Sequence, residues 1–267
     1  MGYCFSRFIE NYNQIMKLLL KNVARIGRFF INLLPLNYRV DHKFQNKYQV
    51  TNTSIALTSL KNKGFLPDAI VDVGCGYGEW FLKANKIFNN SEFYLFDADK
   101  TNEEKLSRLK TKFKNMNYKI CLLSNERKQQ KFYRMGYGSS VYEEKSDYSR
   151  EIDNLTSSTL NDELNINLIR KSKNMIKLDV QGAEIDILQG LQDNLSLFEV
   201  VILEASLREH NLGSPLFPEV CDFMKQKNYI IYDFCDLKRL GNEKSTLVQL
   251  DCVFVKKNSF LLNQKLR

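Results

Sequence analysis

The chain has 267 residues, a length that suits one large domain or one domain with an appendage and argues against a multidomain assembly. Its composition is 43% hydrophobic and 26% charged, which is typical of a globular protein and excludes collagenous, low-complexity and wholly disordered classes. Lys and Arg outnumber Asp and Glu by 39 to 31, and the net charge of +8 favours acidic partners such as nucleic acid, anionic lipid or phosphorylated substrates.

The six cysteines are scattered without a C-x-x-C pair, which argues against a disulfide framework or a zinc site and indicates reduced core thiols. The sequence contains no uninterrupted apolar run long enough to span a membrane, and its start lacks the pattern of a secretion signal. We therefore expect a cytoplasmic protein.

Residues 5–36 have apolar side chains at helical intervals, with basic residues between them, and Pro35 ends the pattern. This predicts a basic amphipathic helix. It could make peripheral contact with the inner face of a membrane, or pack against its own domain or a second subunit of a homo-oligomer, which is the commoner fate. Residues 37–53 are interpreted as a linker, and a second helix over 54–63 ends at Gly64. We predict an N-terminal helical extension over 1–64 and one domain over 65–267.

From Pro67 onward, short apolar runs alternate with helical segments. This order predicts a doubly wound, mostly parallel α/β sheet with helices on both faces. Two further runs, 229–234 and 249–255, predict an antiparallel C-terminal hairpin that brings the sheet to seven strands. Residues 125–173 are too long for a plain connection, so we predict an insertion that carries binding residues. The five predicted parallel strands cover 69–73, 93–96, 118–123, 175–178 and 200–203, and the helices cover 79–88, 103–114, 184–192 and 218–227.

The first of these strands runs directly into three alternating glycines, Gly74, Gly76 and Gly78, and then into a helix. Glycines at such a turn permit positive φ and let a ligand approach the backbone closely. The G-x-G-x-G spacing differs from the G-x-G-x-x-G fingerprint that binds a dinucleotide pyrophosphate, so a ligand without phosphate fits better. A plain tight turn is the alternative.

Acidic residues end three of the predicted strands. Asp97 follows Gly74 by 23 residues, the spacing of an acid that binds both ribose hydroxyls, although it could instead cap the next helix. Asp179 and Glu204 end the fourth and fifth strands. In an open α/β sheet, ligands lie beyond the carboxyl ends of the strands, so we expect both acids to face a reacting centre. A helix cap is the alternative role for Asp179.

Over residues 65–257 the sequence resembles the FkbM-type methyltransferases, which use S-adenosylmethionine. It departs from the family at Cys75-Gly76, where Ala-Asn is commoner, at Asp97-Ala98, where Glu-Pro is commoner, and at Gln181, where Glu is commoner. The resemblance rests on VDVGCGYG, FDAD, Gly138-Ser139-Ser140, Ser158-Thr159-Leu160, IKLDVQGAEIDILQG, LEASLREHNLGSPLFPEVCDFMKQKNY and Gln249-Leu250-Asp251.

The resemblance implies a Rossmann-like methyltransferase that binds S-adenosylmethionine at these motifs. The three glycines would approach the methionyl and ribose parts, and Asp72 would orient the loop or bind the ammonium group. Asp97 would bind the ribose, and Asp179 would lie beside the transferred methyl. Leu123, Ser124 and Asn125, at the end of the third strand, are the expected contacts on the adenine side.

Methyl transfer to oxygen is an in-line displacement in which a base removes the hydroxyl proton. Asp179 is the first candidate for this base, Glu204 the second and His210 the third. The alternative is that Asp179 and Glu204 hold a divalent cation together with Asp251, since oxygen ligands suit magnesium; we do not predict a metal.

The acceptor is expected to meet the insertion and the hairpin. Serine and glutamine suit a polyol, whereas Arg239 suits a phosphate or carboxylate. We expect O-methylation of a sugar, glycan or nucleotide-sugar hydroxyl in polysaccharide or secondary-metabolite synthesis. The alternatives are methylation of nucleic acid or another small molecule, a non-catalytic tethering module, and a dehydrogenase. Nucleic acid is disfavoured because basic residues are spread among acids. The candidate acceptor contacts are Ser139, Ser140, Tyr142, Arg239, Gln249 and Asp251.

Overall fold

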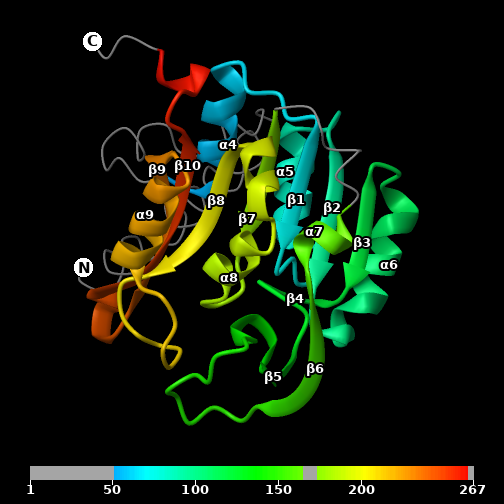
Figure 1. Cartoon of the computed structure of the whole chain (residues 1–267), viewed down its shortest axis with the longest axis vertical. Coiled ribbons are helices and arrows are strands. Elements are labelled where there is room, and N and C mark those ends of the chain that lie inside the picture. The colour runs from blue at the N-terminus through cyan, green and yellow to red at the C-terminus, as the bar shows by residue number, and fades with distance from the viewer. Residues whose placement is uncertain (1–50, 165–172, 264–267) are drawn as a thin grey trace, which may run out of the picture. The chain divides into compact units, whose positions relative to one another are not determined.

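The computed structural model describes residues 51–164 and 173–263, so the helix predicted over 5–36 lies outside the described residues. Within the described part, seven strands form one sheet in the order β3-β2-β1-β7-β8-β10-β9 (Figure 1). Five strands are parallel and β10 runs antiparallel to both of its neighbours, which confirms the predicted doubly wound sheet and its C-terminal hairpin. The strands are β1 (Ala69–Val73), β2 (Glu92–Asp97), β3 (Met116–Ile120), β7 (Asn174–Leu178), β8 (Phe198–Ser206), β9 (Tyr229–Leu240) and β10 (Thr246–Lys256).

Helices cover both faces of the sheet because successive strand residues point to opposite sides. On β1, for example, Ile70 joins one buried cluster and Val71 the other. The first cluster includes residues of α4 (Thr53–Asn62), α5 (Glu79–Ile87) and α6 (Glu103–Lys112). The second includes residues of α7 (Leu160–Glu163), α8 (Glu184–Gln189) and α9 (Phe217–Gln226). The helix predicted over 184–192 is shorter, and a 3-10 turn (Gln192–Leu197) follows it.

Helix α4 belongs to the compact unit that begins at Thr51, whereas the boundary predicted at residue 64 assigned it to the extension. The reason is its apolar face: Ala56, Leu57 and Leu60 are buried against the sheet. The start of α4 is also tied to β9, because the backbone N–H and hydroxyl of Thr53 donate to Asp236.

The prediction of a single strand over 118–123 is wrong, because this segment forms parts of two strands that belong to different sheets. β3 stays beside β2, whereas β4 (Leu122–Ser124) pairs with β6 (Glu151–Thr159), which in turn pairs with β5 (Gln129–Arg134). The change of direction occurs at Cys121, whose N–H still donates to the carbonyl of Asp97 at 2.8 Å. The predicted insertion therefore contributes β5 and β6 to a small sheet, which lies beyond the carboxyl ends of the central strands (Figure 1).

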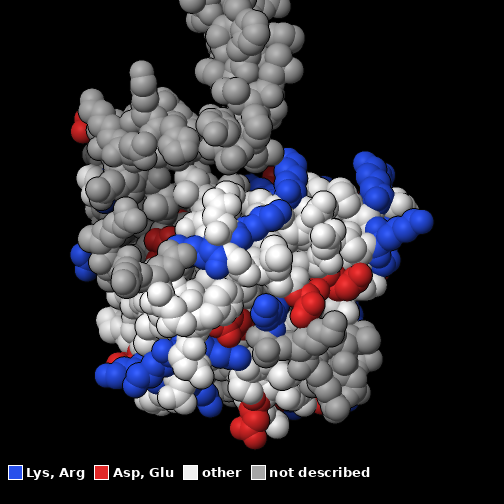
Figure 2. Space-filling view, turned by 90° about the horizontal axis from the view of Figure 1, so that it is seen from above, with Lys and Arg blue, Asp and Glu red and all other residues white. Residues whose placement is uncertain are grey.

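On the face seen in Figure 2, Lys and Arg side chains of the described residues are interspersed with Asp, Glu and uncharged surface. None of the helices that the structure describes is both long and apolar enough to cross a membrane. The five cysteines in the described ranges are free, and three of them, Cys75, Cys235 and Cys252, are buried, as expected for core thiols.

The aromatic cluster beneath α5 gives a test of the core. Phe81 is fully buried, and its ring packs edge-on against Phe93 and Phe113 with centroid separations of 4.9 and 5.2 Å. We expect Phe81→Ala to lower the free energy of unfolding by about 3–5 kcal/mol, through lost burial and the cavity left behind. Urea unfolding measures this, with Tyr148→Ala, at an exposed position, as the control that should leave stability nearly unchanged.

Candidate active site

A cavity of 290 Å³ lies at the carboxyl ends of β1, β2 and β7, where the insertion approaches the glycine turn. Its walls are formed by segments far apart in the sequence, as expected for a ligand site in an open α/β sheet. Seven of the residues predicted from the sequence line it: Gly74, Gly76, Asp97, Leu123, Ser139, Ser140 and Asp179.

The glycine turn holds β1 against the end of β7. Gly74 has φ of +70°, and a Cβ there would lie 1.9 Å from the carbonyl oxygen of Asp179, so only glycine allows the two backbones to approach this closely. Gly76 has φ of +53°, and a Cβ there would meet no protein atom within 4 Å; it therefore borders open space in the cavity wall. Gly78 caps α5 with φ of +90° and does not line the cavity.

Asp97 connects the glycine turn to the end of β2. Its carboxylate accepts hydrogen bonds from the N–H groups of Gly76 at 2.7 Å and Asp99 at 2.8 Å, and from the amide of Asn102 at 3.2 Å. Burial raises the pKa of this carboxyl, and the hydrogen bonds from Asp99 and Gly76 oppose that effect. Asp97 is thus held in the cavity wall at the position expected for a ribose anchor.

The rest of the wall combines apolar and aromatic side chains, most of which sequence reasoning missed. Of the contacts predicted at the end of the third strand, Leu123 lines the cavity together with Leu122, whereas Ser124 and Asn125 do not. Tyr77, from the glycine turn, packs edge-on against Tyr137 of the insertion, with 5.7 Å between the ring centroids. Two aromatic rings from different segments therefore meet at the cavity. Their signal in the sequence was a tyrosine within each of two glycine-rich stretches, G-Y-G in both cases.

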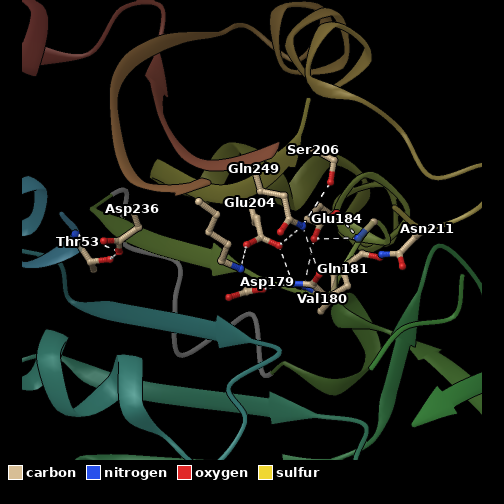
Figure 3. Close-up of polar contacts among 12 residues, drawn as sticks. Thr53, Asp179, Val180, Gln181, Glu184, Glu204, Ser206, Asn211, Asp236 and Gln249 are labelled. Carbon is tan, nitrogen blue, oxygen red and sulfur yellow. Dashed lines mark hydrogen bonds and ion pairs between the residues drawn. The ribbon is translucent and has the colours of Figure 1, made fainter. Parts of the chain in front are cut away.

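Asp179 is the point at which the cavity meets a network of polar side chains (Figure 3). One of its carboxylate oxygens accepts a hydrogen bond from the amide of Gln181 at 2.9 Å. The same amide nitrogen donates to Glu204 at 2.6 Å, and Gln249 donates to the same Glu204 oxygen at 2.9 Å. The other Glu204 oxygen binds the ammonium of Lys238. Glu204 and Gln249 thus stand behind Asp179 and do not line the cavity themselves.

The two bridged carboxyls differ in their titration. Burial disfavours the charged form of Asp179, but the charges of Lys177 and Lys238 outweigh it and lower its pKa. The pKa of Glu204 is raised, chiefly by burial and then by the charge of Asp179. Asp179 is therefore ionised at neutral pH, and its side chain is 33% exposed, whereas that of Glu204 is 2% exposed.

Asp72 lies deeper than predicted. Its side chain is fully buried, does not line the cavity, and forms an ion pair with Lys177 at 3.5 Å. Burial raises its pKa to about 6, against the opposing charge of Lys177. Of the two roles predicted for Asp72, direct contact with a bound ligand is therefore replaced by a contact with a lysine inside the protein, whereas a role in orienting the glycine turn stays a prediction.

The turn after β7 is strained and heavily anchored. Gln181 adopts φ of +54°, which is uncommon for a residue with a side chain. Its carbonyl oxygen accepts from the hydroxyl of Ser140 at 2.8 Å and the amide of Asn211 at 2.6 Å. Glu184 accepts from the N–H groups of Val180 and Gly182 at 3.0 Å. Ser140 therefore holds this turn as well as lining the cavity.

Four other predicted residues lie away from the cavity. The Nε2 atom of His210 is buried and has no hydrogen-bond partner within the part of the chain that the structure describes. The hydroxyl of Tyr142 donates to Asp186 at 3.5 Å, and the exposed Arg239 donates to the carbonyl of Ser245 at 3.3 Å. Asp251 is buried between strands, and burial raises its pKa to about 8. These residues are not brought together with Asp179 at the cavity wall.

The described residues do not fit a divalent cation shared by Asp179 and Glu204. The amide of Gln181 bridges these two carboxylates, and each also contacts a lysine ammonium group. A separate group, Cys235, Asp236 and Asp251, has ligand atoms within 4.8 Å of one another, but Asp236 already accepts two hydrogen bonds from Thr53.

The charges around the cavity fit a cationic ligand. Of its lining residues, Lys105 is basic, whereas Asp97, Asp99 and Asp179 are acidic. A phosphate would require more positive charge, while a sulfonium and an ammonium group would be attracted. The open space at Gly76, the acid at Asp97 and this charge balance are what S-adenosylmethionine requires of a site.

A glycine turn after the first strand and acidic residues at the carboxyl ends of the strands, on a doubly wound sheet, are features of the class of S-adenosylmethionine-dependent methyltransferases. Residues 72–231 match the family model for the methyltransferase FkbM domain, and the chain belongs to this family. No curated protein sequence matches the chain.

Solved structures with a similar fold include three methyltransferases. Precorrin-6y C5,15-methyltransferase from Geobacter metallireducens is 11% identical, with a TM-score of 0.42, and the match covers 78% of this chain and 90% of that one. A SAM-dependent methyltransferase from Aquifex aeolicus is 10% identical, with a TM-score of 0.40 and coverage of 76% and 89%. The 1,6-didemethyltoxoflavin-N1-methyltransferase from Burkholderia thailandensis, solved with S-adenosylhomocysteine, is 10% identical, with a TM-score of 0.43 and coverage of 93% and 90%.

The two turn glycines give a paired test. Gly74→Ala should lower the free energy of unfolding by about 2–5 kcal/mol, because left-handed strain adds to a clash with Asp179. Gly76→Ala should lower the free energy of unfolding only through backbone strain, by about 1–2 kcal/mol, yet it should weaken S-adenosylmethionine binding by about tenfold or more. Urea unfolding and titration calorimetry separate the two effects. Equal binding losses in well-folded forms of both variants would contradict the difference between their roles.

Asp97 gives a test of the donor site. Asp97→Asn should weaken S-adenosylmethionine binding about 10- to 100-fold, because it removes a charged acceptor from the ribose position. The matched control is Glu92→Gln, at the exposed opposite end of the same strand, which should leave binding unchanged. Calorimetry provides the measurement, and wild-type affinity in Asp97→Asn would exclude the ribose role.

Proposed function

We propose that the protein transfers a methyl group from S-adenosylmethionine to a hydroxyl of a sugar, glycan or nucleotide-sugar acceptor. The observation that carries the proposal is the position of Asp179: an ionised, part-exposed carboxylate on the wall of the donor cavity, backed by Gln181, Glu204 and Gln249. Carboxylates and amides are the groups that bind hydroxyls through several hydrogen bonds.

When bound, S-adenosylmethionine supplies an electrophilic methyl carbon attached to a positively charged sulfur. Asp179 would accept the proton of the acceptor hydroxyl as the new oxygen–carbon bond forms and the carbon–sulfur bond breaks. The proton can then leave to solvent from the exposed side of this carboxylate. Glu204 and His210 are less well placed, because neither lines the cavity and all the hydrogen bonds to Glu204 come from within the protein.

The acceptor would lie between the insertion and the loop that follows β8. Ser140 and Asn211, from these two segments, both donate to the carbonyl of Gln181, so the two segments meet at the turn beside Asp179. Ser139 and Ser140 line the same cavity. This arrangement supports a polar acceptor with several hydroxyls more than an apolar one.

The proposal is tested with purified protein, a labelled methyl donor and a panel of sugar nucleotides, glycans and oligonucleotides, followed by identification of the labelled product. We expect label in a sugar O-methyl group and not in nucleic acid. Asp179→Asn should lower kcat by about 100-fold or more while donor binding persists. Asp193→Asn, on the exposed surface, is the control. Label in a base or in protein would overturn the proposed acceptor class.

A further inference from the structure

Lys177 is an ionisable side chain in the middle of an otherwise buried strand. It lies on β7, is 4% exposed, and stands in register with Asp72 on β1. Its ammonium lies 3.5 Å from Asp72 and 3.4 Å from Asp179, the first residue after β7, which follows Lys177 by two positions and so lies on the same side of the strand. Lys177 thus stands between a carboxylate in the core and a carboxylate on the cavity wall.

Burying an ammonium costs several kcal/mol, and an apolar side chain of similar volume would pack at this position without that cost. The cost is offset only if both carboxylates face the lysine. Among the described residues, neither oxygen of Asp72 has a hydrogen-bond partner, and Lys177 is the one basic side chain that forms an ion pair with it. Trp80 of α5 adds its ring at 5.9 Å from the ammonium. Asp72, at the end of the ion-pair arrangement that lies in the core, is therefore inaccessible to ligands.

Asp179, at the other end of the ion-pair arrangement, is accessible to ligands. Asp72 is fully buried, whereas the side chain of Asp179 is 33% exposed and lines the cavity. We propose that Lys177 is a positioning residue: anchored by Asp72, its ammonium holds the carboxylate of Asp179 ionised and aimed at the methyl-transfer site. This inference rests on the proposed function for the role of Asp179, but the ion-pair arrangement itself can be tested without an acceptor.

The other groups facing Asp179 define the comparison that the test needs. Lys238 on β9 reaches the network through Glu204 and has a side chain that is 48% exposed, so water screens its charge more than that of Lys177. Glu204 on β8 and Asp251 on β10 also face this network, and burial raises the pKa of both, which favours their neutral forms. Among these groups, only Lys177 combines direct contact with complete burial.

The test uses Lys177→Met combined with Asp72→Leu. Replacing a buried ion pair by apolar groups of similar volume is often neutral for stability, so this double variant is expected to fold even where Lys177→Met alone does not. The carboxyl of Asp179 is titrated by NMR in protein labelled with ¹³C at aspartate carboxyls, and Asp179→Asn identifies its signal. Removing a cation raises the pKa of a neighbouring acid, so we expect the Asp179 midpoint to rise by about one pH unit or more.

Lys238→Met is the matched control and should shift the Asp179 midpoint less than the double variant does. Once an acceptor is identified, kcat can be measured against pH, and the acidic limb of this profile should shift to higher pH in the double variant. At pH values above that limb, the affinity for the donor should stay within about twofold of wild type. A wild-type Asp179 titration in the folded double variant would overturn the positioning role. A shifted titration without a shifted kcat limb would support the positioning role and instead contradict Asp179 as the base.

Discussion

The close approach of two backbones, at Gly74 and Asp179, is the constraint on which the site depends. No side chain fits between them, because even a Cβ at Gly74 would lie 1.9 Å from the carbonyl oxygen of Asp179. This approach places the turn after β1 and the turn after β7 side by side at one edge of the sheet. The first carries the glycines proposed to bind the donor and the second carries the carboxylate proposed as base, so one packing contact sets the spacing of the two proposed functions.

Much of this arrangement could be predicted from the sequence, because its signals are local. An apolar run followed by alternating glycines specifies a strand, a turn and a helix, and an acid at the end of the next strand falls at a fixed place in such a sheet. Gly74, Gly76, Asp97 and Asp179 accordingly line one cavity. The same local reasoning could not divide the run at 118–123, because Cys121, Leu122 and Leu123 suit either sheet, and only pairing with β6 separates β3 from β4.

The contacts that sequence reasoning missed are those between distant segments. Lys177 carried a signal, a charged residue within an apolar strand, but its meaning depends on Asp72, which lies opposite only because β1 and β7 are neighbours. Asp72 lies within β1 and not beyond its carboxyl end, and its side chain is buried with that of Lys177 on the sheet face where Ile70 and Met175 are also buried. The neighbouring positions of β1 and β7, which no local sequence pattern specifies, are therefore what pairs Asp72 with Lys177.

The strained turn at Gln181 is held rigid by hydrogen bonds, while the neighbouring side chain of Asp179 stays partly exposed. A positive φ at a residue with a side chain costs about 1–3 kcal/mol and persists only where surrounding contacts determine it. Here those contacts come from three places: Ser140 in the insertion, Asn211 after β8, and Glu184, which binds the neighbouring N–H groups. The same turn directs the amide of Gln181 between Asp179 and Glu204, where a carboxylate would add a third negative charge. A neutral donor at this position binds both acids at once, so Asp179 stays ionised and fixed while its outer edge remains free for the acceptor.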